Sequence, residues 1–492
     1  MLFNSVTYIF FFLPTVIIAY WALRGLSQGR ARLLLLIMCS VIFYGFWRVE
    51  FLPLMFASAI VDYFLAIAID KAHDQRRRKH LLWLSLAFNL GVLGFFKYLI
   101  FFKDTLWSLA GLIGYAPSPV ELNIILPLGI SFYIFQTMSY TVDVYRRDIK
   151  PERDMLVYLS FVTFFPHLVA GPIMRPHVLM PQLINPPPFR WRNMRIGVER
   201  ILAGLFLKVA LADTVADFVN AGFNQPIASL TAIDSWTLAF LFGFQIFFDF
   251  AGYSMIAIGS ALMLSIFVPE NFNWPYLATS PREFWKRWHI SLSTWIRDYL
   301  YVPIMGTYKA QGTGAWDTFR DQGETRSPWR RTSALFLTWA IMGFWHGANW
   351  TFALWGIYHA VLIYAHRLLA PLFRWRGRAM PGWLAWCIAL PLMMAGWIPF
   401  RAETLGDSFT MWSKMAMPLG QMGRTLAPNS YILAAALLVG TVMVWGAREV
   451  ITPRLDPRSS ALATARTLTF AILFAVVFVM LQSRSQFIYF QF

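Results

Sequence analysis

The stretch Leu335-Phe-Leu-Thr-Trp-Ala-Ile-Met-Gly-Phe-Trp-His-Gly-Ala-Asn-Trp350 joins an apolar run to a histidine, and the rest of the chain is interpreted around it. The run from Leu335 to Phe344 suits membrane depth, where an ionisable side chain is costly and marks a functional site by default. His346 can give or take a proton near neutral pH. No Asp, Glu or Cys stands within ten residues of it, which argues against a metal cluster or a local triad. The alternative is a core histidine bonded to a backbone carbonyl.

The composition is that of an integral membrane protein. The chain has 492 residues, of which 58% are hydrophobic and 14% charged, whereas soluble proteins carry about 25% charged residues. Apolar runs near the length of a span recur from end to end, which predicts an all-α polytopic protein and not a barrel. The net charge is +17, but Lys and Arg stand in short loops, where they set topology and meet anionic lipid headgroups rather than nucleic acid.

The basic loops predict a topology. The run Val6 to Leu23 is followed by arginines, which places this loop in the cytoplasm and the N-terminus outside, as a retained first helix. The loop 71–79 is also basic and cytoplasmic. The pattern predicts about eleven spans, with re-entrant and interfacial helices besides, in one membrane domain over residues 1–492. The apolar runs on which this count rests are 6–23, 33–47, 52–69, 81–102, 124–145, 196–219, 235–263, 335–350, 351–366, 382–400, 429–447 and 465–481.

One apolar piece does not fit simple counting. The stretch from Leu156 to Met174 has basic residues on both flanks, so both ends should be cytoplasmic. It contains prolines, which break helices, and irregular backbone at membrane depth is tolerated only inside protein or beside a wet cavity. We therefore predict a re-entrant loop over residues 161–172, carrying His167. The alternative is an ordinary kinked span.

The segment 280–301 is predicted to be an amphipathic helix at the cytoplasmic interface. Ser280-Pro-Arg-Glu283 is a capping box with proline at the first helical position. Below it, an aromatic stripe recurs at helical spacing, and its members are Trp285, Trp288, Leu292, Trp295 and Tyr299. His289 falls between this stripe and a basic face. The alternative is a helix that only anchors to lipid. The polar loop 306–331 that follows is predicted to be a cytoplasmic excursion.

These residues resemble a known family. Arg282 to Tyr301 and Gly343 to Trp350 are similar to the two signatures of the membrane-bound O-acyltransferases, in particular the bacterial polysaccharide subgroup. The resemblance extends to Leu126–Tyr133, Phe165–Pro172, Phe248–Ser254 and Tyr489–Phe492. The chain departs from the subgroup at Met255, where Asp is usual, at Trp274, where Gln is usual, and in its longer 306–331 loop. The polymer therefore stays open between alginate, cellulose and another exopolysaccharide.

The resemblance implies helices around a funnel and a narrow tunnel, with the acyl donor entering from the cytoplasm and the acceptor from the other side. It implies that His346 is the family's invariant histidine and His289 its second motif histidine, while His359 matches a histidine of the polysaccharide subgroup. It also implies a bacterial inner-membrane protein with its N-terminus in the periplasm, and a periplasmic partner, a transferase or acceptor that receives the acyl group.

An acyl-transfer mechanism follows as a hypothesis. His346 is the base for the acceptor hydroxyl, His289 positions the donor, and Trp345 and Asn349 orient the base. The donor is acetyl-CoA, with no bound cofactor and no metal. The further donor-binding candidates are Arg282, Trp285, Lys286, Arg287, Arg297 and His359. The cations are suited to coenzyme A phosphates, although lipid headgroups are an equal alternative for each one singly.

A transporter or flippase for a polysaccharide or a lipid-linked sugar is the second function class. It would show inverted repeats and paired intramembrane charges. The sequence shows neither clearly, because Asp62, Asp143 and Asp249 lie in or at spans without an obvious cation partner. A structural scaffold for a secretion complex is the third class, and it needs no buried histidine.

Overall fold

The computed structural model describes residues 1–24, 26–115, 122–169, 171–306, 327–372, 380–417, 423–448 and 459–481. The chain packs as two compact units. One comprises Met1–Ile201 and Tyr253–Pro269, and the other comprises Leu202–Gly252 and Glu270–Phe492. Two long helices continue from one unit into the other, so the expectation of a single domain over 1–492 stays a prediction. Most of the 306–331 loop and the ending Tyr489–Phe492 lie outside the described residues.

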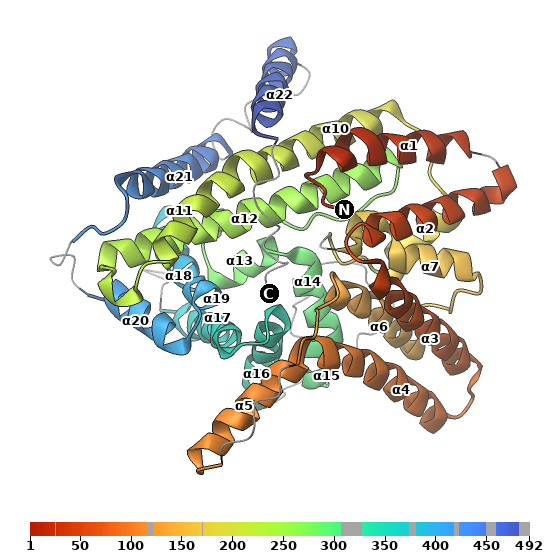
Figure 1. The fold of residues 1–492 in the computed structure, drawn as a ribbon, viewed down its shortest axis with the longest axis horizontal. Helices are drawn as coiled ribbons and strands as arrows, with labels where there is room; N and C mark the ends of the chain where they lie inside the picture. The colour runs from red at the N-terminus through yellow and green to blue at the C-terminus, as the bar shows by residue number, and fades with distance from the viewer. Residues whose placement is uncertain are drawn as a thin grey trace. The chain divides into compact units, whose positions relative to one another are not determined.

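The described chain is helical (Figure 1). In the first unit the elements are η1 (Thr7–Phe12), α1 (Leu13–Ala22), η2 (Leu26–Gly29), α2 (Arg30–Gly45), η3 (Val49–Phe51), α3 (Leu52–Lys71), α4 (Gln75–Leu93), η4 (Gly94–Tyr98), α5 (Leu99–Leu112), α6 (Ile130–Arg146), α7 (Met155–Thr163), α8 (Phe165–Leu168) and α9 (Pro176–Ile184). The helices shared by both units are α10 (Trp191–Leu205) and α12 (Ala232–Met263). The second unit adds η5 (Phe206–Ala212), α11 (Asp213–Phe223), η6 (Ile227–Ser229), η7 (Pro275–Leu277), α13 (Pro281–Arg287), α14 (Ile290–Ile296), η8 (Arg297–Tyr301), α15 (Val302–Met305), α16 (Pro328–His346), α17 (Trp350–Leu369), α18 (Gly382–Ala395), α19 (Ile398–Arg401), α20 (Leu405–Met415), α21 (Pro428–Gly446) and α22 (Ser460–Met480).

Seven stretches of described helix are long and apolar enough to cross a membrane. They are Val49–Lys71, Gln75–Leu112, Ala232–Met263, Trp350–Leu369, Gly382–Arg401, Pro428–Gly446 and Ser460–Met480. The all-helical membrane fold is confirmed, whereas the count of about eleven is not. Other predicted runs form helices that are shorter or more polar. The first apolar helix covers only Thr7–Ala22, and α16 carries Arg330 and Arg331 in its first turn.

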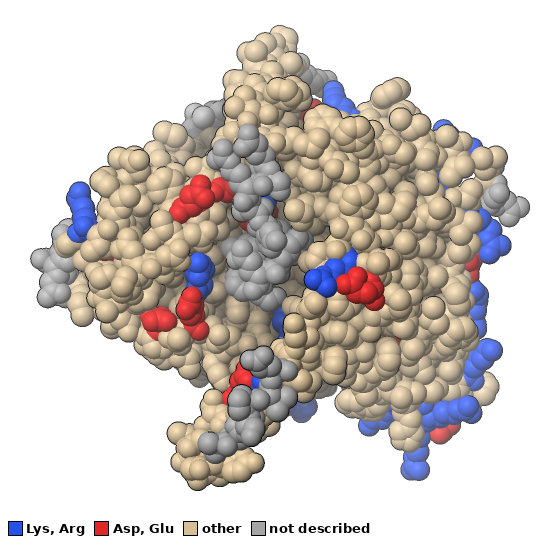
Figure 2. Space-filling view, viewed as in Figure 1, with Lys and Arg blue, Asp and Glu red and all other residues tan. Residues whose placement is uncertain are grey.

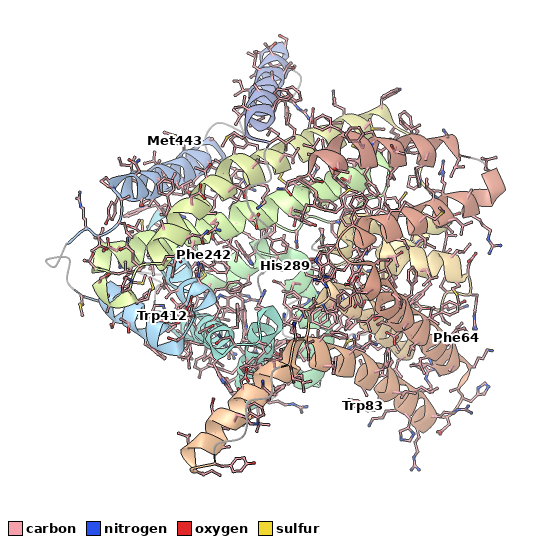
Figure 3. The ribbon with its side chains drawn as sticks, viewed as in Figure 1. Phe64, Trp83, Phe242, His289, Trp412 and Met443 are labelled. Carbon is pink, nitrogen blue, oxygen red and sulfur yellow. The ribbon has the colours of Figure 1, made fainter. Side chains whose placement is uncertain are left out.

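The surface of the helices agrees with a membrane environment. Phe64 on α3, Trp83 on α4 and Met443 on α21 are exposed apolar side chains (Figure 3), as lipid-facing positions require. Most of the face in Figure 2 carries no charge. Lys and Arg gather at the lower right of that view. Arg76, Arg77 and Lys79 are exposed at the start of α4, next to the turn that follows α3. These residues belong to the loop that the sequence assigns to the cytoplasm.

The helix break expected within 161–172 is present. Helix α7 ends at Thr163, Phe164 is non-helical, and Pro166 lies in the first turn of the one-turn helix α8. The side chain of His167 is buried. A Cβ at Gly171 would lie 2.5 Å from the Cα of His167, so only glycine fits this return of the chain. The break is confirmed, and the passage of this segment as a re-entrant loop stays a prediction.

Gly129 joins two of the sequence stretches that carry the family resemblance. Its φ is +69°, a left-handed conformation that side-chain-bearing residues rarely adopt. A Cβ there would also lie 2.7 Å from the backbone oxygen of Leu168. The position therefore requires glycine both for its backbone angle and for the close approach of α8.

We expect Gly129→Ala to lower the free energy of unfolding by about 1–3 kcal/mol, because it adds left-handed strain and a backbone clash. Thermal unfolding of the purified protein in detergent measures this loss. The matched control is Gly91→Ala in α4, where a Cβ meets no atom within 4 Å. Equal Tm values for the two variants would contradict the prediction.

Two pairs of glycines bring α10 and α12 into backbone contact. A Cβ at Gly259 would lie 2.7 Å from the backbone oxygen of Gly197, and a Cβ at Gly252 would lie 2.6 Å from that of Gly204. Small residues at a helix interface allow close packing without large side chains between the backbones. We call these four residues the glycine seam. It fixes the register of α12, the helix that passes beside the histidines described below.

Candidate active site

The hairpin of α16 and α17 is held by glycines. A Cβ at Gly343 would lie 2.3 Å from the backbone oxygen of Phe352, and a Cβ at Gly356 would lie 2.2 Å from that of Trp339. Asn349 begins α17, because its side-chain oxygen accepts a hydrogen bond from the backbone N–H of Thr351 at 3.0 Å. The hairpin expected over 335–350 and 351–366 is therefore confirmed. It presents His346, the last residue of α16, at the turn.

His346 is buried among aromatic rings. Its ring centroid lies 4.9 Å from that of Trp345, 4.8 Å from that of Trp355 and 5.3 Å from that of Phe400. Its side chain is 5% exposed. An apolar, nearly dry surrounding disfavours the charged imidazolium, so this environment suits a neutral base.

The stretch 280–301 does not form the single helix that its spacing predicts. Helix α13 ends at Arg287, and α14 begins at Ile290. Between them His289 has φ +41° and ψ +56°, a left-handed conformation. The aromatic side chains Trp285, Trp288 and Trp295 are buried, so the stripe packs into protein. The prediction of one helix is wrong. The helical spacing of the aromatic residues continues across the two residues between α13 and α14, and the break there is set by tertiary contacts that the spacing does not reveal.

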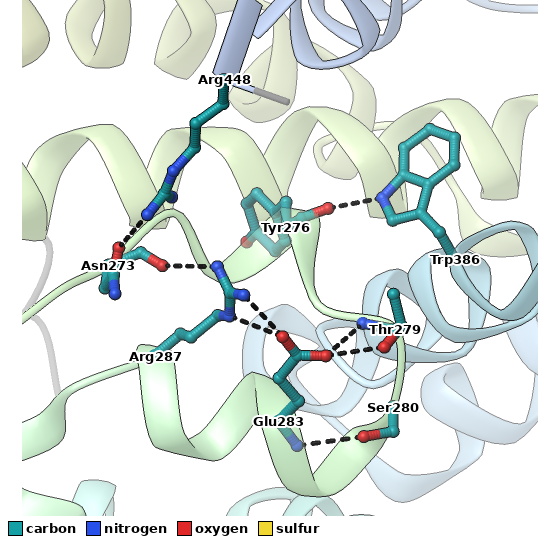
Figure 4. Close-up of polar contacts among 8 residues, drawn as sticks. All are labelled: Asn273, Tyr276, Thr279, Ser280, Glu283, Arg287, Trp386 and Arg448. Carbon is teal, nitrogen blue, oxygen red and sulfur yellow. Dashed lines mark hydrogen bonds and ion pairs between the residues drawn. The ribbon is translucent and has the colours of Figure 1, made fainter. Parts of the chain in front are cut away.

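The start of α13 agrees with the capping box (Figure 4). The Ser280 hydroxyl oxygen accepts a hydrogen bond from the backbone N–H of Glu283 at 3.2 Å. The Glu283 carboxylate in turn accepts hydrogen bonds from the backbone N–H of Thr279 at 2.8 Å and from the Thr279 hydroxyl at 2.7 Å. Arg287, one helical turn on, binds the other carboxylate oxygen of Glu283.

Asn271 sets the tautomer of His289. Its Oδ1 accepts hydrogen bonds from the backbone N–H of Ser291 at 3.3 Å and from the Ser291 hydroxyl at 2.9 Å, which identifies this atom as the oxygen. His289 Nδ1 lies 3.1 Å from the same oxygen and therefore donates a proton to it. The lone pair of the neutral imidazole is then on Nε2. Asn271 was not among the residues predicted from the sequence, although it stands three residues before Trp274.

Two aromatic residues connect His289 to the rest of the cluster. Phe250 of α12 meets the His289 ring edge-on at 4.6 Å, and Trp345 lies 6.4 Å away, centroid to centroid. Because Trp345 also contacts His346, the two motif histidines share one aromatic cluster. Figure 3 labels His289 at the beginning of α14. The structure thus brings together the two residues that the sequence assigned to catalysis.

His359 belongs to the same cluster. It lies one helical turn after Trp355 on α17, with the two rings 5.1 Å apart. Trp285 of α13 meets the His359 ring at 4.9 Å, and Trp339 of α16 lies 5.8 Å away. His359 is fully buried. Its predicted contact with a donor therefore requires the donor to enter between these indoles.

The basic residues divide into two groups. Arg287 binds Glu283 and the backbone oxygen of Asn273 (Figure 4), and Arg297 binds Asp298 at 2.7 and 3.1 Å. Both guanidinium groups are therefore committed to the fold. Arg282 and Lys286 are exposed on α13. Of the four cations predicted to contact phosphate, these two are the exposed ones.

The structure shows where Asn349 lies, and where the two residues lie that depart from the subgroup. Besides capping α17, the Asn349 side-chain nitrogen donates to the backbone oxygen of Glu403 at 3.4 Å, which leaves its predicted part in orienting His346 without support. Met255 is half-buried on α12. Trp274 precedes η7 with φ +48° and is 49% exposed.

Asp249 has the cation partner that sequence reading did not find. Lys208 Nζ lies 2.7 Å from Asp249 Oδ1 and 2.8 Å from Asp213 Oδ1. Asp62 lies in a polar network instead: it accepts hydrogen bonds from Ser85 at 2.6 Å and from Asn89 at 2.7 Å. The statement that Asp249 lies without a cation partner is therefore wrong. Within the described ranges, no group of three His, Cys, Asp or Glu side chains is arranged to hold a metal ion.

The free energy of unfolding should fall in acid through His289. Burial lowers the pKa of His289 from its ordinary 6.5 to about 3, because the charged imidazolium would lose its water. At a pH between these two pKa values, His289 binds a proton in the unfolded chain but not in the folded one. The free energy of unfolding therefore falls as the pH drops below 6.5. At about pH 5 the loss is about 2 kcal/mol.

The Tm of the wild type and of His289→Asn, measured at about pH 7 and about pH 5, tests this expectation. Asparagine accepts the left-handed backbone and does not titrate. The variant should lose less Tm on acidification than the wild type. The same loss in both proteins would show that His289 does not carry this dependence.

Comparisons with known proteins identify the family. The model of the membrane-bound O-acyltransferase family matches residues 123–316, which include the 280–301 stretch. The protein named Probable alginate O-acetylase AlgI of Azotobacter vinelandii is 37% identical over 91% of this chain and 85% of its own length. The Pseudomonas aeruginosa protein of the same name is 38% identical over 84% of this chain and 75% of its own.

Relatives with other names also match the chain. The Peptidoglycan O-acetyltransferase of Helicobacter pylori is 34% identical over 84% of this chain and 80% of its own length. The Teichoic acid D-alanyltransferase of Bacillus subtilis is 29% identical over 49% of this chain. With its helical membrane fold and paired buried histidines, the chain belongs to the membrane-bound O-acyltransferase family and is an O-acyltransferase.

Proposed function

We propose that the protein takes an acetyl group from acetyl-CoA on the cytoplasmic side of the bacterial inner membrane and delivers it for O-acetylation of an exopolysaccharide. Relatives that match most of this chain are named for acetyl transfer to alginate or peptidoglycan, which supports acetyl as the group moved. The polymer is alginate, cellulose or a similar exopolysaccharide. A periplasmic transferase or acceptor protein takes part, and the N-terminus lies in the periplasm.

The observation that carries the proposal is the burial of His289 and His346 in one aromatic cluster, bridged by Trp345. His346 takes the proton of the acceptor hydroxyl while that oxygen attacks the thioester carbon. The tetrahedral intermediate then collapses, the carbon–sulfur bond breaks, and the thiolate receives the proton back from the imidazolium. The products are an acetyl ester and free coenzyme A, and no net proton is released.

His289 is the donor-positioning residue in this scheme. Asn271 holds its Nδ1 proton, so Nε2 presents a lone pair that can accept a hydrogen bond from an amide of the donor. The exposed charges of Arg282 and Lys286 supply the contacts for coenzyme A phosphates. Arg287 and Arg297 support α13 and η8 instead, through their ion pairs.

The experiment measures release of free thiol from acetyl-CoA by the purified protein in lipid nanodiscs, together with the acetyl content of polysaccharide secreted by the producing cells. We expect thiol release by the wild type and acetate ester in the polymer. Butyryl-CoA is the matched control donor. A wild type that consumes no acetyl-CoA, in cells whose polymer carries no acetate, would overturn the choice of donor and acceptor.

The buried Lys208–Asp249 pair is the feature that favours a transporter, since paired intramembrane charges are typical of transport proteins. Transport of a lipid-linked sugar would not depend on His346. Export of unacetylated polymer that stops in a Lys208→Met strain and continues in a His346→Ala strain would favour this second candidate.

A further inference from the structure

A buried ion pair lies against α12, one residue away from the ring that contacts His289. Lys208, in the π-helical turn η5, reaches Asp249 of α12 at 2.7 Å and Asp213, the first residue of α11, at 2.8 Å. The three side chains are 3%, 3% and 4% exposed, in that order. A π-helical turn is rare and is frequent at functional sites. The acyl-transfer scheme above uses none of these residues.

Stability alone is a weak explanation for such a pair. Removing charges from water costs several kcal/mol per ion, and replacing a buried ion pair by neutral groups is often neutral or stabilising. Here two carboxylates face one ammonium group, so burial of the second carboxylate adds a further cost in free energy. The better-attested use of buried charges is to fix one arrangement of the elements that carry them.

The arrangement that the pair fixes is that of α12 against η5. Beside Asp249, a Cβ at Gly252 would lie 2.6 Å from the backbone oxygen of Gly204 and 3.1 Å from the backbone nitrogen of Lys208. At this point the helix backbones are in contact, and the ion pair crosses the same interface. A small rotation or slide of α12 would break both contacts together.

The next residue along α12 faces the site. Phe250 meets the His289 ring at 4.6 Å and Phe272 at 5.1 Å, and Phe272 lies beside Trp288 at 5.1 Å. Asp249 and Phe250 are consecutive on one rigid helix, so the position of the carboxylate determines that of the phenyl ring. The His289 ring is thus held on one side by Asn271 and on another by a residue whose placement depends on Lys208.

We propose that the Lys208–Asp249 ion pair is a positioning pair for acyl transfer: it fixes α12 so that Phe250 holds the His289 ring in its productive orientation. Asp213 is a second acceptor for Lys208 and does not contact α12 through this pair. The kinetic part of this inference rests on the proposed acetyl transfer.

The experiment compares two isosteric variants in the full-length protein. Asp249→Asn removes the ionic contact to α12 and leaves Lys208 balanced by Asp213. Asp213→Asn makes the same change of charge and leaves the contact to α12. We expect Asp249→Asn to lower kcat roughly tenfold with KM for acetyl-CoA nearly unchanged, because a misplaced ring costs rate rather than binding. Asp213→Asn should keep kcat within about twofold of the wild type.

A second variant tests the route through Phe250. Phe250→Leu should lower kcat to a similar extent, and the double variant Asp249→Asn with Phe250→Leu should be no slower than the worse single variant. The effects of two substitutions on the activation free energy do not add when both act through one contact, whereas the effects of independent substitutions do. Tm values for each variant, together with the amount that remains monodisperse in detergent, show that the proteins compared are folded.

An activity-independent readout separates this inference from the proposed function. In protein with ring-15N-labelled histidine, the His289 signal is assigned by its loss in His289→Asn. It should shift in Asp249→Asn and Phe250→Leu and stay in place in Asp213→Asn. An unchanged signal and kcat in Asp249→Asn, or equal effects of both aspartate changes, would overturn the positioning pair. A wild type inactive on acetyl-CoA would overturn the proposed donor, and the signal would then decide the inference.

Discussion

The His346→Gln variant is expected to lose acyl transfer by about 10²–10⁴-fold while remaining in the membrane at wild-type levels. Glutamine keeps a polar side chain of similar reach, so the aromatic cluster formed by Trp345, Trp355 and Phe400 retains its packing. It cannot take a proton from the acceptor hydroxyl. The acetyl content of secreted polymer, at matched membrane protein levels, measures the effect.

The same series includes His289→Asn, His359→Gln and the exposed control His80→Gln. We expect reduced but measurable acetylation for His289→Asn, because a positioning residue lowers the rate without removing the base. His80 is exposed in the second turn of α4, and its replacement should have no effect. Wild-type acetylation by His346→Gln would show that another group is the base, and His289 would be the first to reconsider.

The second large effect is expected from a single methyl group at Gly356. The added Cβ of Gly356→Ala would lie 2.2 Å from the backbone oxygen of Trp339, so α16 and α17 must separate by roughly 1 Å to restore ordinary contact. That separation carries Trp355 and His359 away from His346. Because a misplacement of about 1 Å can cost 10²-fold, we expect kcat to fall by about that factor.

The matched control is Gly440→Ala in α21, a helical glycine at which a Cβ meets no atom within 4 Å. Alanine there should be neutral or raise stability by about 0.5–1 kcal/mol. Thiol release from acetyl-CoA and Tm are measured for both variants. Full activity of Gly356→Ala would show that the hairpin tolerates separation and that its glycines do not determine the geometry of the site.

Much of the helical framework could be predicted from the sequence. The expected run 235–263 corresponds to α12, 52–69 to α3 and 429–447 to α21. These segments are long and uniformly apolar, so composition alone determines them. The span count was less predictable, because α10, η5 and α11 form a long helical stretch that includes charged residues such as Lys208 and Asp213. The sequence predicted 196–219 as a span, whereas this stretch is not among the seven described helices that are long and apolar enough to cross a membrane.

The identity of the two motif histidines could be predicted from the sequence, but the backbone conformation at His289 could not. The two signature stretches contain both His289 and His346, and the cap at Ser280 was correct. The break at His289 depends on Asn271, whose backbone oxygen accepts a hydrogen bond from the N–H of Ile290 at 2.9 Å. Such a partner cannot be read from helical spacing. The pairing of Arg287 with Glu283, one turn apart, was visible in the sequence and reduces the number of free cations.

The glycine seam limits how the chain can change in length. Each helical residue turns the chain by about 100°, so one residue inserted into α10 between Gly197 and Gly204, or into α12 between Gly252 and Gly259, would rotate one glycine out of the seam. A larger side chain would then face a backbone oxygen. Relatives should therefore differ in length outside these two stretches, and tags or domains are best inserted elsewhere in the chain. Gly197 and Gly204 are separated by the same number of residues as Gly252 and Gly259, so a change of length in one helix would need an equal change in the other.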